Sequence, residues 1–435
     1  MWLRRKAGKP KSHSTKAPAR VVNGLQQARL PVDLLQQGMR VVKLDRPWTE
    51  VPVLYQGFRI ITDAHLQTLR QYCDWVVVES DASIILAAEE ALKQRQQLTL
   101  RPLPETASLE HALPQARQAY DDTQAFINRL LDDLAKDIAP SLTDAKPLIR
   151  SCVSSINTNA NAMFWLARIK NQDAYTAEHC LRVAIFAIAF AKFMGLPEDD
   201  LEVVGLCGLL HDIGKLKVPD AILNKPGPLA PEEMAEMRRH TQLGHQLLAA
   251  DNSLDSIVAD VSLQHHERLD GKGYPNQLAS HQISRFARLI TIVDVYDAVT
   301  SDRCYQAGRS PADAMGIIYR GRGEQFDADM VEAFIRMVGI YPPGSLVELK
   351  NGEVGLVVGC HPQRKLKPRL ELLLDKDKQP QAARLIDLGD NPKDADGQLY
   401  SILKPLSDGA YGLSLNDRIR QLTSPNRPTT PVLAG

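Results

Sequence analysis

The sequence lacks the features that mark secreted, membrane-embedded or nucleic-acid-binding proteins. It has only six cysteines in 435 residues, and none of them forms a Cys-x-x-Cys pair, so we expect reduced core thiols rather than a disulfide framework. No apolar run approaches the roughly 20 residues of a membrane helix, and the N-terminus has no apolar segment like that of a signal peptide. The 52 basic residues balance the 52 acidic ones, which gives no electrostatic reason to expect nucleic-acid binding. We therefore expect a soluble, cytoplasmic protein with no transmembrane segment.

A chain of this length is long enough for two or three domains, each with its own core. The predicted fold class is multidomain: an all-α main domain, a small α/β N-terminal domain and a small β C-terminal extension. We assign a basic disordered tail (1–27), an α/β regulatory or interaction domain (28–107), a helical connector (108–170), the main helical domain (171–341), the β-rich extension (342–423) and a loose tail (424–435).

The N-terminal third shows three kinds of pattern. Residues 1–20 carry seven basic residues and no acid, which predicts a solvated tail or a segment that contacts an acidic lipid surface or partner. Short strand-like runs at 39–44, 51–55 and 75–78 flank a helical pattern at 64–72. These runs hold no cluster of candidate ligands, so the domain is interpreted as a module for regulation or interaction.

The connector and the C-terminal extension carry simpler signals. In the connector, Leu130, Leu131, Leu134 and Ile138 form one apolar stripe, which packs either on the main domain or against a second subunit in a homodimer. In the extension, the Asn-Gly pair at 351–352 predicts a β-hairpin. Another strand is expected at 370–374.

One helix of the main domain ends in a charged pair. Residues 201–210 are apolar on nearly every side, and His211, Asp212 and, one turn later, Lys215 follow them. A buried carboxylate without a partner costs several kcal/mol, so Asp212 should meet a metal ion or another cation. Taken alone the pair is weak evidence, because His-Asp pairs also occur by chance.

Further candidate ligands lie in the same part of the chain. Seven of the 11 histidines fall between His179 and His281, and Asp294 sits in an apolar run where a lone acid would be costly. The complete set of candidate metal ligands is His179, His211, Asp212, His240, His265, His266 and Asp294.

Their number favours two metal ions over one. Mixed imidazole and carboxylate ligands suit Fe, Mn, Zn, Co or Ni, and two six-coordinate ions offer about 12 positions. With Asp212 as a bridge, seven residues fill about eight of these and leave roughly four for water and substrate. A single tetrahedral zinc would leave most of the ligands unused.

This ordered set of motifs resembles the metal-dependent HD phosphohydrolase superfamily. The run from His265 to Pro275, which contains Gly273-Tyr274-Pro275, is similar to the signature of its HD-GYP subfamily, whose members hydrolyse the bacterial second messenger cyclic di-GMP. The similarity spans about residues 171–341. Residues 44–48 and 56–58 also resemble an uncharacterised domain that is often found N-terminal to HD-GYP domains.

The resemblance implies an HD-type catalytic domain with a binuclear centre of Fe or Mn, or alternatively Ni, Co or Zn. It implies hydrolysis of cyclic di-GMP to linear pGpG, and in some members on to GMP, by a metal-activated hydroxide. Asp212 and Lys215 then have catalytic roles, and Lys215 and Arg303 bind the substrate phosphate. Simpler roles are a surface lysine for Lys215 and, for Arg303, an ion pair with a neighbouring acid. A diguanylate cyclase or another signalling protein is the implied protein partner.

Several positions qualify these expectations. Some family members place a glutamate where this chain has Tyr175, and that glutamate supports a third metal, so we expect a binuclear site here. A basic residue is common where Gln306 stands, and its loss would weaken substrate binding or change the preferred dinucleotide. Asp297 is expected to support a ligand or to cap a helix, and His245 to be a packed helix residue. Tyr274 is expected either to stack near the ligand or to form a partner surface.

Three functions remain open from the sequence. The first is an active cyclic di-GMP phosphodiesterase. The second is a phosphohydrolase acting on another cyclic or linear nucleotide. The third is a low-turnover module that binds the messenger or a protein partner.

Overall fold

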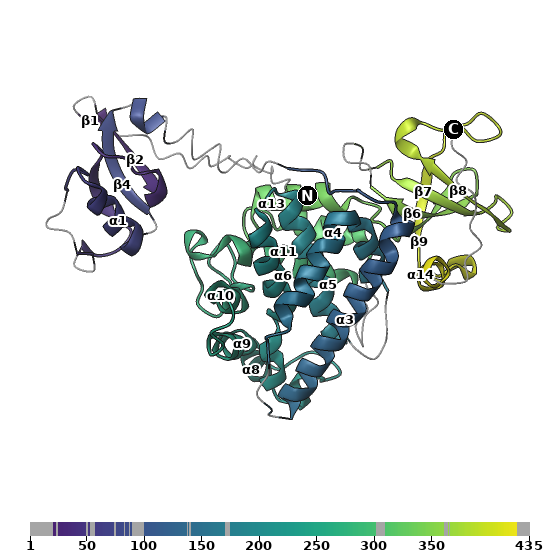
Figure 1. Cartoon of the computed structure of the whole chain (residues 1–435), viewed down its shortest axis with the longest axis horizontal. Helices are drawn as coiled ribbons and strands as arrows, with labels where there is room; N and C mark the ends of the chain where they lie inside the picture. Colours follow the sequence, from purple (N-terminus) through teal and green to yellow (C-terminus); the bar gives the residue numbers. More distant parts are fainter. Residues whose placement is uncertain are drawn as a thin grey trace, which may run out of the picture. The chain divides into compact units, whose positions relative to one another are not determined.

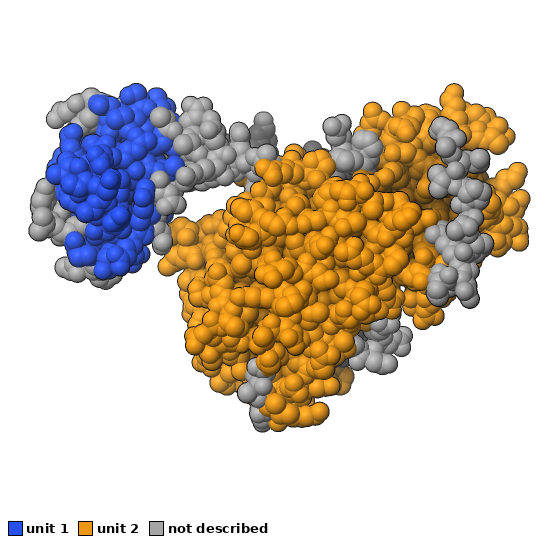
Figure 2. All heavy atoms as spheres, viewed as in Figure 1, with its two compact units in different colours: residues 1–98 blue, residues 99–435 orange. Residues whose placement is uncertain are grey.

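A computed structural model describes residues 21–22, 25–48, 51–52, 57–73, 75–81, 83–86, 88, 100–136, 138, 141–169, 175–301, 309–360, 364 and 366–423. The chain forms two compact units, residues 1–98 and residues 99–435 (Figure 2). Arg303 and Gln306 lie outside the described residues.

The N-terminal unit is a four-stranded antiparallel sheet with one helix. Its strand order is β1-β2-β4-β3, and its elements are β1 (Val21–Val22), β2 (Leu25–Pro31), β3 (Arg40–Leu44), α1 (Asp63–Tyr72) and β4 (Trp75–Asp81). The run expected at 75–78 is part of β4, and its alternate residues Val76 and Val78 lie in the core. Thr62 caps α1, because its side chain accepts a hydrogen bond from the His65 backbone N–H.

Two predicted boundaries in this unit need correction. The basic tail was expected to reach residue 27, but β2 begins at Leu25 and pairs along its whole length with β4. Gln26 and Gln27 are polar, so their sequence did not indicate a strand. The strand forms here because these residues pair with β4. A strand was also expected at 51–55, where Val51 and Pro52 belong to no strand and residues 53–55 lie outside the described part.

The second unit has a helical body. Its helices are α3 (Leu109–Ala135), α4 (Ala145–Ala167), α5 (Tyr175–Phe193), α6 (Glu198–Leu210), α7 (Asp220–Leu223), α8 (Pro231–Arg238), α9 (His240–Ala249), α10 (Ser256–Gln264), α11 (Arg285–Thr300), α12 (Pro311–Arg320) and α13 (Ala328–Val338), with short 3-10 turns η3 (Ile213–Lys217) and η4 (Ser280–Gln282) (Figure 1). Helices α5 and α6 lie at its centre, and α6 is buried on most sides as its apolar sequence predicts.

The helical connector packs against the main domain within the same chain. Helix α3 lies along α4 and α5, and it buries Leu113, Tyr120, Leu130 and Leu134 there. Ile138, which was expected to extend the stripe, follows the end of the helix and is 51% exposed. The contacts account for most of the apolar stripe without a second subunit.

The C-terminal extension is a five-stranded antiparallel sheet in the order β8-β7-β6-β5-β9. Its elements are β5 (Leu346–Leu349), β6 (Val354–Gly359), β7 (Arg369–Leu374), β8 (Pro380–Asp387), β9 (Ile402–Leu406), the 3-10 turns η5 (Leu388–Asp390) and η6 (Ala410–Gly412), and α14 (Leu415–Thr423). The predicted hairpin is β5–β6, with Gly352 at φ +92°. The Trp165 indole of α4 donates a hydrogen bond to the Val357 carbonyl of β6 at 3.1 Å, so the sheet is docked on the helical body.

The fold class is therefore a mostly helical main domain with a small N-terminal sheet domain and a C-terminal sheet extension. Among the described helices, none combines the length and apolar character needed to span a bilayer.

Candidate metal centre

Seven side chains that are far apart in the sequence meet inside the helical body. They belong to α5 (His179), the residues after α6 (His211 and Asp212), the start of α9 (His240), the residues after α10 (His265 and His266) and α11 (Asp294). Their ligand atoms form two groups, one of Asp212, His240, His265 and His266 and one of His179, His211 and Asp294. Within each group these atoms lie within 4.8 Å of one another.

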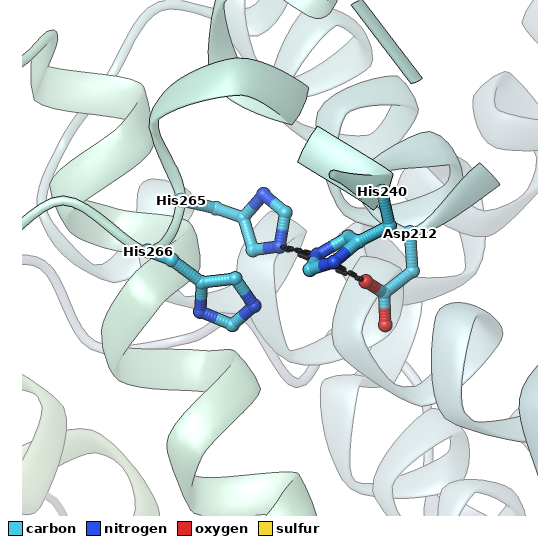
Figure 3. Close-up of side chains that lie close together, drawn as sticks. All are labelled: Asp212, His240, His265 and His266. Atoms are coloured by element: carbon cyan, nitrogen blue, oxygen red, sulfur yellow. Dashed lines mark hydrogen bonds and ion pairs between the residues drawn. The ribbon is translucent and has the colours of Figure 1, made fainter. Parts of the chain in front are cut away.

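The Asp212 carboxylate stands between the two groups. Its Oδ1 lies 3.4 Å from His240 Nε2 and 3.6 Å from His265 Nε2. Its Oδ2 lies 3.3 Å from His211 Nε2 and 3.6 Å from His179 Nε2. Figure 3 shows the first group, with His240 between Asp212 and His265. Each oxygen of one carboxylate thus faces a different set of imidazoles.

Backbone carbonyls hold three of these imidazoles in one orientation. The Nδ1 atoms of His211, His240 and His265 lie 2.8, 2.7 and 2.8 Å from carbonyl oxygens three residues earlier in the chain. A carbonyl can only accept, so Nδ1 carries the proton in each ring and Nε2 offers its lone pair to the centre. This is the tautomer that binds a metal through Nε2.

A glycine allows the first group to assemble. In η3, Gly214 lies so close to α9 that an added Cβ would be 1.9 Å from the His240 carbonyl oxygen and 2.4 Å from the Gly244 nitrogen. Any larger residue would push α9 away and move His240 from Asp212. Helix α8 ends at Arg238, and His240 is the first residue of the next helix, α9.

Two buried atoms fit a cation. His211 Nε2 and Asp212 Oδ1 are buried, and neither has a hydrogen-bond partner among the described residues. Buried polar atoms are normally satisfied, because an unsatisfied one costs about 1–3 kcal/mol. Both atoms are electron-pair donors that face the centre, so the seven residues suit divalent transition metals that take nitrogen and oxygen ligands.

The electrostatics keep two of the candidate carboxylate ligands ionised and the His240 ring neutral. Burial raises the pKa of Asp212, but the positive charge of Lys215 outweighs burial and holds that pKa well below its usual value. Burial also raises the pKa of Asp294, but its hydrogen bond with His179 outweighs burial and holds that pKa far below its usual value. Burial lowers the pKa of His240 to about 4. At neutral pH the carboxylates are ionised and the His240 imidazole is neutral, as metal ligation requires.

Asp297 contacts the candidate ligand His179 on the side of the ring that faces away from the cluster. From the sequence, Asp297 was expected either to support a ligand or to cap a helix. Its Oδ2 lies 2.7 Å from His179 Nδ1, and Arg182 donates to Oδ1 at 2.7 Å and to Oδ2 at 3.0 Å. Burial raises the pKa of Asp297, but the charge of Arg182 outweighs it and keeps that pKa well below its usual value. Arg182 was missed entirely, although a charged residue within the apolar sequence of α5 was a signal that could have marked it.

Lys215 lies at the rim of the same centre. Its ammonium donates to Asp212 Oδ2, and its side chain is 28% exposed. Burial lowers the pKa of Lys215, but the negative charges of Asp212 and Asp294 outweigh burial and raise it. The group therefore stays positively charged beside the ligands and is open to solvent on one side.

The loop with the Gly-Tyr-Pro sequence forms one wall of the centre. The Tyr274 ring lies 4.7 Å from the His266 ring, and Arg238 lies 5.0 Å above the Tyr274 ring. The Glu267 carboxylate is buried, and it accepts hydrogen bonds from the backbone N–H groups of Asn276 at 2.7 Å and Leu278 at 3.0 Å. Glu267 was not singled out from the sequence, yet it fixes this loop.

Two adjoining cavities of about 260 and 360 Å³ lie beside Tyr274. Arg238, Lys272 and Tyr274 line both of them. Two cations and an aromatic ring give these cavities the chemistry to hold a phosphate and a base.

Two predicted positions lie apart from this assembly. His245 is not in the cluster; its ring lies 3.8 Å from the exposed Asp260. The phosphate-binding assignment of Arg303 falls on a residue outside the described part, as do Gln306 and the side chain of Tyr175.

Three family models match the chain. An HD domain covers residues 160–330, a domain of unknown function (DUF3391) covers residues 27–145, and a KOW domain associated with HD domains covers residues 346–393. The second match extends through α3, beyond the first compact unit.

Curated relatives match the chain over different lengths. "Cyclic di-GMP phosphodiesterase PA4108" of Pseudomonas aeruginosa is 36% identical over 368 residues, which is 83% of this chain and 89% of that protein. "Cyclic di-GMP phosphodiesterase response regulator RpfG" of Xanthomonas campestris is 37% identical over 173 residues, 39% of this chain and 46% of that protein. "3'3'-cGAMP-specific phosphodiesterase 2" of Vibrio cholerae is 32% identical over 168 residues, 38% of this chain and 32% of that protein.

The first relative is matched along most of both chains, so the similarity extends beyond the HD domain to the N-terminal domain and the C-terminal sheet. The chain therefore belongs to the HD-GYP family of metal-dependent phosphohydrolases.

Proposed function

We propose that this protein hydrolyses cyclic di-GMP to linear pGpG, and to GMP where the same centre cleaves the second phosphodiester, with two divalent metal ions. The observation that carries the proposal is the position of Asp212, whose two oxygens face two separate ligand groups. A bridging carboxylate between two ions is the simplest use of that geometry. Fe and Mn are the proposed metals.

The ions would be held by His240, His265, His266 and Asp212 on one side and by His179, His211, Asp294 and Asp212 on the other. When bound, such ions lower the pKa of a water molecule and stabilise negative charge on phosphate oxygens. Every other contribution comes from the chain itself.

Lys215 supplies a positive charge and a hydrogen-bond donor to the reacting phosphate. Its ammonium stays protonated next to Asp212, and its partial exposure leaves it within reach of a ligand. At this place it can bind a phosphate oxygen or donate a proton to the departing sugar oxygen.

The Tyr274 loop supplies the binding surface. A base can stack on the Tyr274 ring, and Arg238 and Lys272 can pair with the phosphate that is not being cleaved. The Glu267 carboxylate keeps this surface in place through its two backbone hydrogen bonds. Binding energy from the second half of the substrate then positions the first half at the metal centre.

The test is hydrolysis by the full chain, purified without oxygen and loaded separately with iron or manganese. Cyclic di-GMP, 3'3'-cGAMP and pGpG are offered in turn, and the products are separated by chromatography. We expect metal-dependent formation of pGpG from cyclic di-GMP, lost in Asp212→Ala and retained in Asp260→Ala, an exposed aspartate that serves as the matched control. Turnover by Asp212→Ala at the wild-type rate would refute the proposal.

A second candidate is hydrolysis of another cyclic dinucleotide, since one relative over the HD region is named as specific for 3'3'-cGAMP. A higher kcat/KM for 3'3'-cGAMP than for cyclic di-GMP would select it. A protein that binds two metal ions and converts none of the three nucleotides would instead be a low-turnover signalling module.

A further inference from the structure

A cavity of about 630 Å³ lies in the second unit, between the helical body and the C-terminal sheet. Helices α4, α5 and α11 contribute to one side, and residues 405–408, which form the end of β9 and the two residues after it, contribute to the other. None of the seven candidate metal ligands is among the described residues that line it. Its size is within the range of about 300–1,000 Å³ that is typical of small-molecule sites.

Positive charge predominates in this cavity. Among the described residues that line it are three arginines, Arg168, Arg182 and Arg309, and two acids, Asp297 and Asp408. Asp297 is already bound by Arg182 and His179. Arg309 is exposed, and no acid within ion-pair distance of it is found among the described residues. Asp408 accepts a hydrogen bond from the Leu415 backbone N–H at 2.9 Å and acts on Arg168 through its charge, but it forms no ion pair with Arg168 among the described residues. The Arg168 and Arg309 guanidinium groups can therefore still take an anion.

Arg168 gives the strongest indication that this cavity is a binding site. Its Nε is buried and has no hydrogen-bond partner in the described part of the chain. Gly344 packs close to the Arg168 side chain: a Cβ added at Gly344 would lie 3.4 Å from the Arg168 Nε. A buried donor on a charged group is costly unless it is paired, so an anion in the cavity would supply the partner that the protein does not.

Another part of the wall is apolar and aromatic. Phe186 and Tyr296 line it, with their ring centroids 5.5 Å apart in an edge-to-face arrangement, and Leu415 of α14 lies in the same wall. The hydroxyls of Ser345 and Ser407 also line the cavity. A ligand that satisfies both walls has an anionic end and a flat, mostly apolar end.

We propose that this cavity binds a purine nucleoside monophosphate, with its phosphate on Arg168 and Arg309 and its base against Phe186 and Tyr296. The site is separate from the metal centre but adjoins its support. Arg182 lines the cavity and holds Asp297, which in turn holds His179. A bound nucleotide would thus lie beside the residue pair that orients one metal ligand.

The test is calorimetric titration of the metal-loaded full chain with GMP and, separately, with guanosine. Replacing Arg168 by Gln removes the charged donor, and the loss of one charge-assisted hydrogen bond should weaken GMP binding roughly 10- to 100-fold. Arg309→Gln should also weaken GMP binding. Because Arg309 is exposed, this variant tests the phosphate site even if Arg168→Gln fails to fold. Arg320→Gln on α12 is the matched control and should bind GMP as wild type does.

Asp212→Ala separates this cavity from the metal centre. The proposal is supported if Asp212→Ala still binds GMP and both arginine variants bind it more weakly. GMP must also bind more tightly than guanosine. GMP binding that is lost in Asp212→Ala and unchanged in Arg168→Gln would assign the nucleotide to the metal centre and overturn it. Equal binding of GMP and guanosine, or no saturable binding of GMP, would overturn it as well. None of these outcomes depends on which dinucleotide the enzyme hydrolyses.

Discussion

Replacing Asp297 by Asn should weaken metal binding without removing any metal ligand. The substitution keeps the shape of the side chain, but it removes the negative charge and turns one acceptor oxygen into an NH₂ donor. Both oxygens of Asp297 are in use, one by His179 and Arg182 together and the other by Arg182. The amide must therefore present a donor either to the His179 ring or to the guanidinium.

The expected magnitude follows from the partners that are lost. Losing the outer partner of a metal-binding histidine lowers metal affinity by about 10- to 100-fold, or roughly 1.4–2.7 kcal/mol. Asp297 is also 2% exposed, and breaking a buried ion pair by changing one partner costs about 3–5 kcal/mol of folding stability. Both effects should appear in the same variant.

Competition with a chelator, at a temperature well below the melting point of the variant, measures the metal affinity. Thermal unfolding of the same samples measures the stability. Asp260→Asn is the matched control, because Asp260 also faces a histidine, His245 at 3.8 Å, but is 48% exposed. Wild-type metal affinity in folded Asp297→Asn would refute the assigned role of the Asp297–His179 contact.

Three further predictions follow from the site. Gly214→Ala should destabilise the protein by about 1–3 kcal/mol and lower its metal content, because the new Cβ would collide with the His240 carbonyl; Gly316→Ala in α12 is its control, and equal melting temperatures for the two would contradict the packing argument. Chelation should lower the melting temperature of the wild type, since metal binds the folded state, and the shift should be absent in Asp212→Ala. Glu267→Gln should raise KM for cyclic di-GMP roughly tenfold with metal content unchanged, because it weakens two charge-assisted hydrogen bonds to the loop; loss of metal instead would show that Glu267 acts on the centre itself.

The sequence alone was enough to find the seven candidate ligands. Several of them stand where an apolar pattern is broken by a histidine or an acid, as at Asp294 in α11 and at the end of α6. Burial of such groups is unfavourable without partners, so the hydrophobic pattern itself marks them. The Asn-Gly hairpin was equally local, because turn geometry depends on adjacent residues.

The sequence did not reveal β2 or the last two strands of the C-terminal sheet. The residues of β2 gain their pairing from β4, about 50 positions away. The outer strand β8 is largely exposed, so its sequence carries little apolar alternation. Strand formation at such positions depends on partners more than on intrinsic preference.

The sequence by itself determined the chemistry of the centre, that is, its histidine and aspartate ligands. Residue types and interruptions of an apolar pattern can be read locally along the chain. Only the tertiary structure decided how that chemistry is divided: which histidines face which oxygen of Asp212, and that Asp297 holds His179 across 118 residues of sequence. The tertiary structure also decided that Arg168 and residues of the C-terminal sheet line the same cavity. Contacts between distant segments depend on how helices and sheets pack, and no local pattern records the distance between two side chains on different elements.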